Sequence, residues 1–148
     1  MTWQETEADI IALLRQSSAL QTELKNCHEE AANEKQKMLL HLARVLDAFD
    51  RVFDNIGPKE KDTDHQTKIW LGNFRSIRRV VDSTLKEEGV RKIESPTGKA
   101  TPGFHTIVET VENPELEDDT IVEELERGYL WGEQVLRKAS VKTVKNGC

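Results

Sequence analysis

The sequence contains few aromatic residues, cysteines and prolines. Aromatic residues make up 5% of the 148 residues, and there are 2 cysteines and 4 prolines. Together with 36% hydrophobic and 32% charged residues, this composition fits helices with solvated faces better than a thick globular core. Cys27 and Cys148 are too few and too far apart to suggest a disulfide framework. We interpret Cys148 as incidental and Cys27 as a small buried residue on a helix seam, with a redox switch across a dimer as the alternative.

Long apolar runs are also absent. No run approaches the roughly 20 residues needed to cross a bilayer. The residues before Ile10 include no basic side chain, which excludes the basic region of a secretory signal and the arginine-rich pattern of a transit peptide. A net charge of −6 gives no electrostatic reason to expect nucleic acid or an anionic membrane as a partner. We therefore expect a cytoplasmic protein that binds neither.

Sequence patterns that require catalysis are missing as well. The sequence has no phosphate-binding glycine-rich loop, no His-Glu-x-x-His and no Cys-x-x-Cys. The four histidines share no spacing with other metal-ligand types, and the carboxylates form runs typical of solvated faces. We expect no enzymatic activity, no metal site and no cofactor.

An apolar heptad pattern dominates residues 10–56. One line of positions runs in sevens from Ile10, and a second line lies three residues later, then four residues later. A repeat of 3.5 residues that relaxes toward 3.6 predicts a two-stranded coiled coil that opens into a broader helical bundle. Such a helix would be roughly 70 Å long and needs a partner, most simply a second copy. The residues expected to mediate dimerisation are Ile10, Leu13, Leu20, Leu24, Met38, Leu42, Val45, Phe49 and Val52.

The seam is weakest over residues 26–41, where Glu34 and His41 occupy positions that should be apolar. We interpret this stretch as a loose part of the paired helices. It motivates the hypotheses of early reversible melting and of a substrate-holding chaperone.

A second helix is predicted to end at Gly89. Thr2 with Glu5 has the spacing of a capping box for the first helix, and Gly57-Pro58 should end that helix. We expect a charged loop over residues 59–65 and a second capping box formed by Thr63 with Gln66. The apolar residues that then recur at helical spacing are Ile69, Trp70, Ile77, Val80, Val81 and Leu85. The basic run Arg75, Arg78 and Arg79 lies off this stripe, as a solvated face or as a partner contact.

Short segments rich in β-branched residues follow Gly89. They predict a small β domain with strands over residues 90–93, 106–111, 120–125 and 134–144. Alternation in the last segment suits one strand covered on a single side.

The expected fold is α+β. A long dimerising helix and a short antiparallel helix would give a dimeric four-helix bundle, followed by a small C-terminal β domain. The predicted divisions are a paired-helix stalk over 1–37, a helical bundle over 38–89 and a β domain over 90–148.

Four motifs in this order resemble GrpE, the nucleotide exchange factor of DnaK-type chaperones. Residues 45–53 (VLDAFDRVF) resemble the family's VLDxLxRAL, and residues 85–93 (LKEEGVRKI) resemble its LxxxGVxxI. Residues 102–105 (PGFH) match the later half of its FDPxxH turn. The best match is residues 128–141 (GYLWGEQVLRKASV), against GYxLxxRVLRPAMV. The resemblance covers about residues 38–145.

The chain departs from this pattern at several positions. Ala100 and Thr101 replace Phe and Asp, Lys138 replaces Pro and Ser140 replaces Met. Gln134 stands where the family often has a basic residue that faces the chaperone. These departures are consistent with a partner-binding surface that has diverged from that of the family.

The resemblance implies a homodimer whose β domain binds the nucleotide-binding domain of a DnaK-type chaperone and promotes ADP release. Gly128 and Gly132 would shape the turn that carries Tyr129 and Trp131. For both aromatic residues, packing inside a small domain is the alternative to partner contact. The residues expected to bind the partner are Pro102, His105, Tyr129, Trp131, Gln134 and Arg137. The competing hypothesis is a homodimeric coiled-coil scaffold whose β domain binds a different protein.

Overall fold

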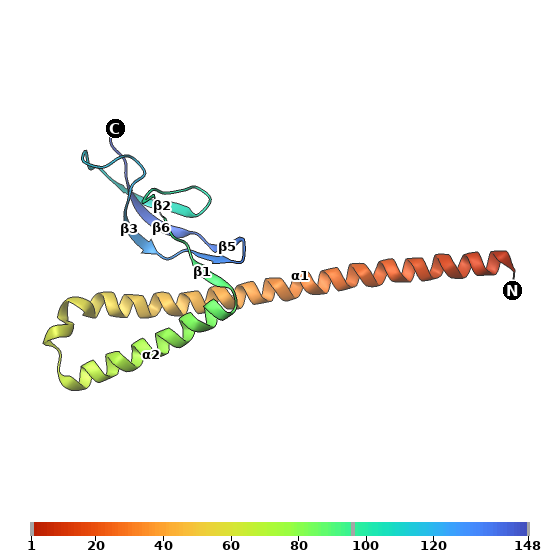
Figure 1. Ribbon diagram of the computed structural model, residues 1–148, viewed down its shortest axis with the longest axis horizontal. Coiled ribbons are helices and arrows are strands. Elements are labelled where there is room, and N and C mark those ends of the chain that lie inside the picture. The colour runs from red at the N-terminus through yellow and green to blue at the C-terminus, as the bar shows by residue number, and fades with distance from the viewer. Residues whose placement is uncertain (1, 96, 148) are drawn as a thin grey trace. The chain divides into compact units, whose positions relative to one another are not determined.

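The computed structural model describes residues 2–95 and 97–147, so Cys148 lies outside the described residues (Figure 1). Three helical elements precede six strands. The helices are α1 (Trp3–Ile56), the 3₁₀ helix η1 (Gly57–Asp62) and α2 (His65–Glu87). The strands are β1 (Val90–Lys92), β2 (His105–Val111), β3 (Ile121–Glu126), β4 (Tyr129–Trp131), β5 (Gln134–Arg137) and β6 (Ala139–Val144). The α+β fold class predicted from the sequence is confirmed.

The predicted capping box at the start of α1 is confirmed. The Thr2 N–H donates to Glu5 Oε2 at 2.8 Å, and the Glu5 N–H donates to Thr2 Oγ1 at 3.3 Å. The helix continues to Ile56, directly before Gly57-Pro58, as expected. The predicted end of the second helix is also confirmed, because α2 ends at Glu87 and Gly89 follows with a left-handed φ of 84°.

The connection between the helices differs from the prediction. Residues 57–62 form the 3₁₀ helix η1 instead of a loop, because the fixed φ of Pro58 suits the first turn of a helix. Asp64, not Thr63, caps α2, and its side chain accepts from the Thr67 N–H at 3.3 Å. The Thr63 hydroxyl instead donates to the Glu60 carbonyl at 2.7 Å, which closes the end of η1.

The chain forms two units, residues 1–38 and 39–148. In the first unit, apolar side chains of α1 are exposed along the expected seam. Cys27 is exposed in the single chain, and its interpretation as a buried residue on a paired helix seam stays a prediction.

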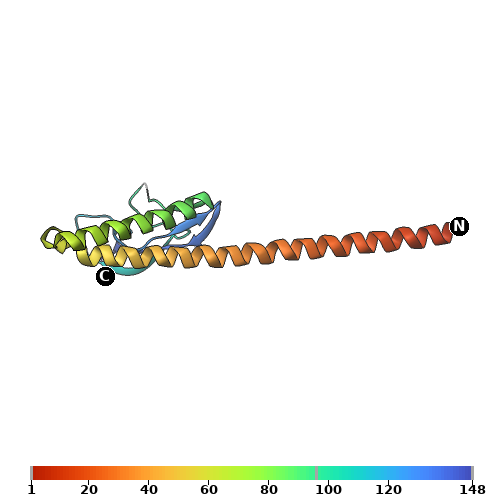
Figure 2. The ribbon, with the colours of Figure 1, turned by 90° about the horizontal axis from the view of Figure 1, so that it is seen from below.

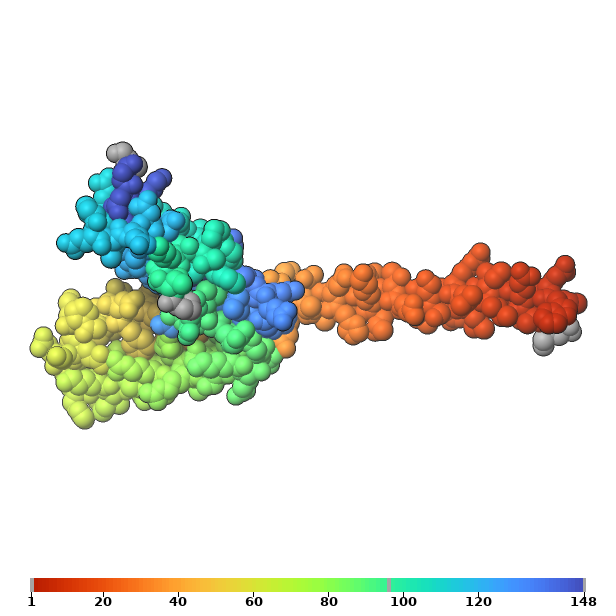
Figure 3. All heavy atoms as spheres, turned by 45° about the horizontal axis from the view of Figure 1, so that its top comes forward, coloured from red at the N-terminus to blue at the C-terminus, as the bar shows by residue number. Residues whose placement is uncertain are grey.

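The core of the second unit joins the helices to the strands. Leu39, Ala43 and Leu46 lie on one face of α1, as their spacing of four and three residues dictates. They pack in one cluster with Leu85, Val90, Tyr129 and Leu136. Figure 2 shows α2 running back along the C-terminal part of α1, and Figure 3 shows these two helices packed side by side. The strands that contribute to this core are β1, β4 and β5.

The strands form two three-stranded sheets. The first sheet has the order β1-β4-β5 and is antiparallel. The second has the order β2-β6-β3, in which β2 is parallel to β6 and β3 is antiparallel to it. The strands expected over residues 90–93, 106–111 and 120–125 are confirmed to within one residue at each end.

The strand expected over residues 134–144 is wrong as a single element. It divides at Lys138 into β5 and β6, which belong to different sheets. Leu136 and Ala139 are both buried although three residues apart, so the side-chain alternation is interrupted at the division. The turn expected around Tyr129 and Trp131 contains strand β4, which pairs with β5 as a hairpin.

Among the described residues, none of the helices combines the length and apolar character needed to span a bilayer. The same part of the chain holds no group of three or more metal-ligating side chains placed to share an ion.

Candidate partner-binding site

The six residues expected to bind a partner come from two neighbouring parts of the fold. Four belong to the hairpin β4–β5, Pro102 belongs to the segment before β2, and His105 is the first residue of β2. Pro102 and Gln134 are exposed, whereas His105 and Tyr129 are buried. The structure therefore separates two exposed candidates from side chains that have contacts within the chain.

His105 closes the segment between β1 and β2. Its Nδ1 accepts from the Thr101 N–H at 3.0 Å, and its Nε2 lies 2.6 Å from Ser95 Oγ. The role of His105 in the structure is to hold the backbone that carries Pro102.

Tyr129 lies in the core, with 4% of its surface exposed. The guanidinium carbon of Arg137 is 5.4 Å from the centre of its ring. Burial raises the pKa of the Tyr129 phenol above its ordinary value of 10, and the carboxylates of Asp47 and Asp50 act in the same direction. The side chains of Arg127 and Arg137 partly oppose this shift.

Titration of the phenol tests this burial directly, because Tyr129 is the one tyrosine in the sequence. We expect the tyrosinate absorbance of the folded protein to appear above pH 10, and that of the urea-unfolded protein to appear near pH 10. Since the folded pKa is the higher one, its contribution to stability is fully present below pH 10 and is lost as the pH rises past it. Tyr129→Phe is the control and should remove the signal. Equal midpoints in the folded and unfolded states would contradict a buried phenol.

Trp131 ties the hairpin to the end of α2. Its indole N–H donates to the Glu88 carbonyl at 3.2 Å, at the C-terminal cap of the helix. The ring remains partly exposed, so Trp131 is available to a partner on one side only.

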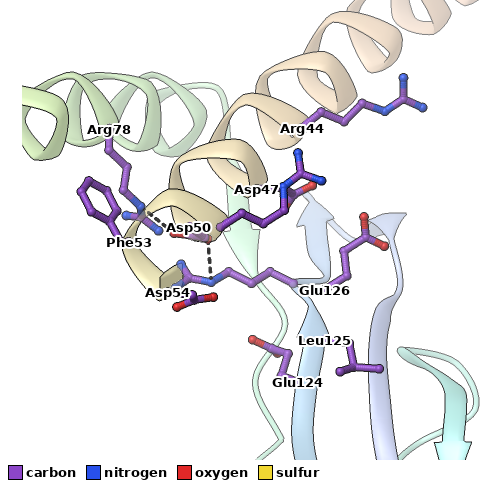
Figure 4. Close-up of a pocket in the computed structure, with 11 residues that line it drawn as sticks. Arg44, Asp47, Asp50, Phe53, Asp54, Arg78, Glu124, Leu125 and Glu126 are labelled. Carbon is purple, nitrogen blue, oxygen red and sulfur yellow. Dashed lines mark hydrogen bonds and ion pairs between the residues drawn. The ribbon is translucent and has the colours of Figure 1, made fainter. Parts of the chain in front are cut away.

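Arg137 connects β5 to α1. Its guanidinium makes two hydrogen bonds to the Asp47 carboxylate, at 2.6 and 2.9 Å. A second ion pair lies nearby, where Arg78 reaches Asp50 at 2.8 Å and Arg127 approaches the same carboxylate at 3.4 Å. Figure 4 shows Asp47, Asp50 and Arg78 at a polar groove of about 880 Å³, which is lined by residues of α1, α2 and β3.

Asp47, Asp50 and Ser95 were not predicted as contacts of the site. Asp47 and Asp50 lie three residues apart beside the apolar face of α1, and this spacing was the available signal. The basic run of α2 is also engaged within the chain. Arg78 binds Asp50, and Arg75 binds Glu60 at 2.6 Å and stacks on Phe53.

The residues expected to mediate dimerisation lie on exposed surface or at its edge. Val45 and Val52 are each 41% exposed, and Leu42 and Phe49 are partly buried beside them. In the first unit, Ile10, Leu13, Leu20, Leu24 and Met38 are more than half exposed. The exposed apolar side chains of α2 were not part of this predicted set. They are Ile69, Trp70, Phe74, Ile77 and Val80.

Comparison with known proteins identifies the family. A profile of the GrpE family matches residues 3–145. The chain is 30% identical over 133 residues to Protein GrpE of Chlorobium luteolum, covering 87% of this chain and 67% of that protein. It is 37% identical to Protein GrpE of Parageobacillus thermoglucosidasius and 35% identical to that of Rhizobium johnstonii, covering 72% and 70% of this chain. The chain spans only 46% and 50% of the lengths of these last two relatives. The chain belongs to the GrpE family.

Proposed function

We propose that this protein is a non-enzymatic nucleotide exchange factor, which binds the nucleotide-binding domain of a DnaK-type chaperone and promotes ADP release. The observation that carries the proposal is the family match over residues 3–145. It is supported by the hairpin β4–β5, which carries the best-matching motif and presents Gln134 at its exposed end. The proposal keeps the cytoplasmic location expected from the sequence.

This function needs no catalytic residue. A protein that binds the open state of the chaperone more tightly than the closed state shifts the equilibrium by that difference in affinity. By linkage, the affinity of the chaperone for ADP falls by the same factor. In this proposal Pro102, Gln134 and the exposed side of Trp131 contact the chaperone, and His105 and Tyr129 hold those contacts in place.

The proposal includes a homodimer. Within residues 39–148, α1 and α2 each carry a stripe of exposed apolar side chains, and the two stripes are neighbours. The apolar side chains that pack inside the chain lie on the other face of each helix. A second copy would bury both stripes in a four-helix bundle. Within residues 1–38, the exposed seam of α1 would pair with its counterpart as a coiled coil.

Release of a fluorescent ADP analogue from the DnaK-type chaperone of the same organism tests the function. Stoichiometric amounts of the protein should accelerate release strongly. No acceleration by a folded dimer would favour the coiled-coil scaffold with a different partner. That second candidate is favoured by Lys138, whose ammonium donates to the Pro102 carbonyl at 3.1 Å and so alters the exposed loop at a position where the family has proline. A pull-down that recovers no DnaK-type chaperone would support it.

The substitution Gln134→Glu tests the exposed end of the hairpin. An added carboxylate at a position where the family often has a basic residue should oppose the complementary surface of the chaperone. We expect the acceleration of ADP release to fall by about tenfold at a fixed low concentration of the protein, a typical size for an interface charge change. The matched control is Gln4→Glu in the first turn of α1, where an acidic side chain is favourable and no effect is expected. Equal activity of both variants would remove Gln134 from the interface.

A further inference from the structure

We infer that Arg137 and Asp47 form a positioning pair that sets the orientation of the hairpin β4–β5 on α1, and that Arg137 does not contact the chaperone. This inference rests on the proposed function and concerns how the site transmits binding into ADP release.

Most of the hydrogen-bonding capacity of Arg137 is used within the chain. A guanidinium has five N–H donors. Two reach the Asp47 carboxylate at 2.6 and 2.9 Å, and two reach the Arg127 carbonyl at 3.0 and 2.6 Å. The fifth faces Glu126, whose carboxylate lies 3.2 Å from the guanidinium. Four donors are thus hydrogen-bonded within the chain, and the fifth lies in the ion pair with Glu126.

The pair is also shielded from solvent. The side chains of Arg137 and Asp47 are 15% and 20% exposed. An ion pair at such a depth resists screening by salt, and the two parallel hydrogen bonds fix the guanidinium in the plane of the carboxylate. The pair joins residues 90 positions apart in the sequence.

The ion pair between Arg137 and Asp47 is directional, whereas the apolar core around it is not. Leu39, Leu46 and Leu136 hold the hairpin against the helix by burial of apolar surface, which is non-directional. The bidentate pair adds a fixed angle at the end of β5, three residues from the exposed Gln134. Loss of the pair should therefore leave the hairpin attached while its exposed residues lose their fixed orientation.

The experiment compares Asp47→Asn, Arg137→Lys and the double variant in the ADP-release assay, as a function of protein concentration. Neither substitution keeps a bidentate charged pair, because a lysine ammonium cannot form the planar fork. We expect each single variant to lower the release rate at saturating protein by about fivefold or more, the range of a typical coupling between two sites. The double variant should lose no more than either single one, because both remove the same interaction.

The matched control is Asp54→Asn, an exposed aspartate of α1 in the same groove, which should keep the wild-type rate. A purely structural role would reduce the amount of active protein and shift the half-saturating concentration, with an unchanged rate at saturation. That outcome would overturn the inference, as would an effect of Arg137→Lys without one of Asp47→Asn, which would indicate direct contact.

Asp47→Glu provides a second variant in case Asp47→Asn does not fold. It keeps the carboxylate but moves it by one methylene, so the saturating rate should lie between those of the wild type and Arg137→Lys. An unchanged rate would again contradict the inference. If the wild-type protein itself fails to accelerate ADP release, the proposed function fails first, and the comparison of variants is then made on chaperone binding, where the two singles and the double should still agree.

Discussion

Replacement of Gly128 by alanine is expected to destabilise residues 39–148 by about 3 kcal/mol, toward the upper end of the cost of overpacking. Gly128 lies where the chain passes from the second sheet into β4. A Cβ atom there would overlap the backbone nitrogen of Ala139 and stand 2.8 Å from Ile93 Cδ1. Backbone atoms cannot rotate away as a side chain can, so the two backbone segments at Gly128 and Ala139 must move apart. Urea denaturation followed by tryptophan fluorescence, at fixed protein concentration, measures the loss.

The control for this substitution is Gly103→Ala. Gly103 has an ordinary φ and no atom within 4 Å of the position of an added Cβ. Alanine there should leave stability unchanged or raise it slightly, through the lower entropy of the unfolded chain. Similar denaturation midpoints for the two variants would show that the contact between Gly128 and the backbone of Ala139 leaves room for a Cβ atom.

The double substitution Val45→Glu with Val52→Glu should convert the proposed dimer into monomers. The two valines lie seven residues apart on the exposed apolar stripe of α1 and would be buried between copies. Each buried carboxylate without a partner costs several kcal/mol, so the dimer should weaken by at least about a thousandfold. Light scattering at micromolar concentration measures the mass, and circular dichroism should show a loss of helix in α1.

Arg44→Glu with Arg51→Glu is the matched control. These arginines share the spacing of seven residues and line the polar groove of α1 instead of the apolar stripe. The control changes more charge than the test variant, yet it should keep the mass of the dimer. A test variant that remains dimeric would place the interface on another surface.

The helices could be predicted well because their signals are local. Heptad spacing, the Thr2 capping box and Gly57-Pro58 determined the course of α1 without tertiary information. The N-cap of α2 was missed because Thr63 and Asp64 are both good caps, and only the bond from Thr63 to Glu60 distinguishes them.

The strands and the site depended on contacts that no local pattern contains. Residues 134–144 contain no proline or glycine, so nothing in this segment marks the division at Lys138. The division arises because the backbone of Ala139 passes against Gly128, a contact between residues that are not close in the sequence. The assignment of Tyr129, His105 and Arg137 to a partner-binding site stays a prediction, and packing of Tyr129 was the alternative left open. The bonds from Arg137 to Asp47 could not be predicted from local spacing, because they join residues 90 positions apart.

The order of the strands has a consequence for synthesis on the ribosome. The central strand of the second sheet, β6, follows all the other described strands in the sequence. In the first sheet, β1 cannot pair until β4 has been synthesised. The apolar face formed by Leu39, Ala43 and Leu46 therefore emerges about ninety residues before Leu136 can cover it. Local helix contacts can form early, whereas both sheets must wait for the C-terminal strands. A nascent chain of this protein thus exposes the kind of surface that chaperones bind until β5 has been synthesised.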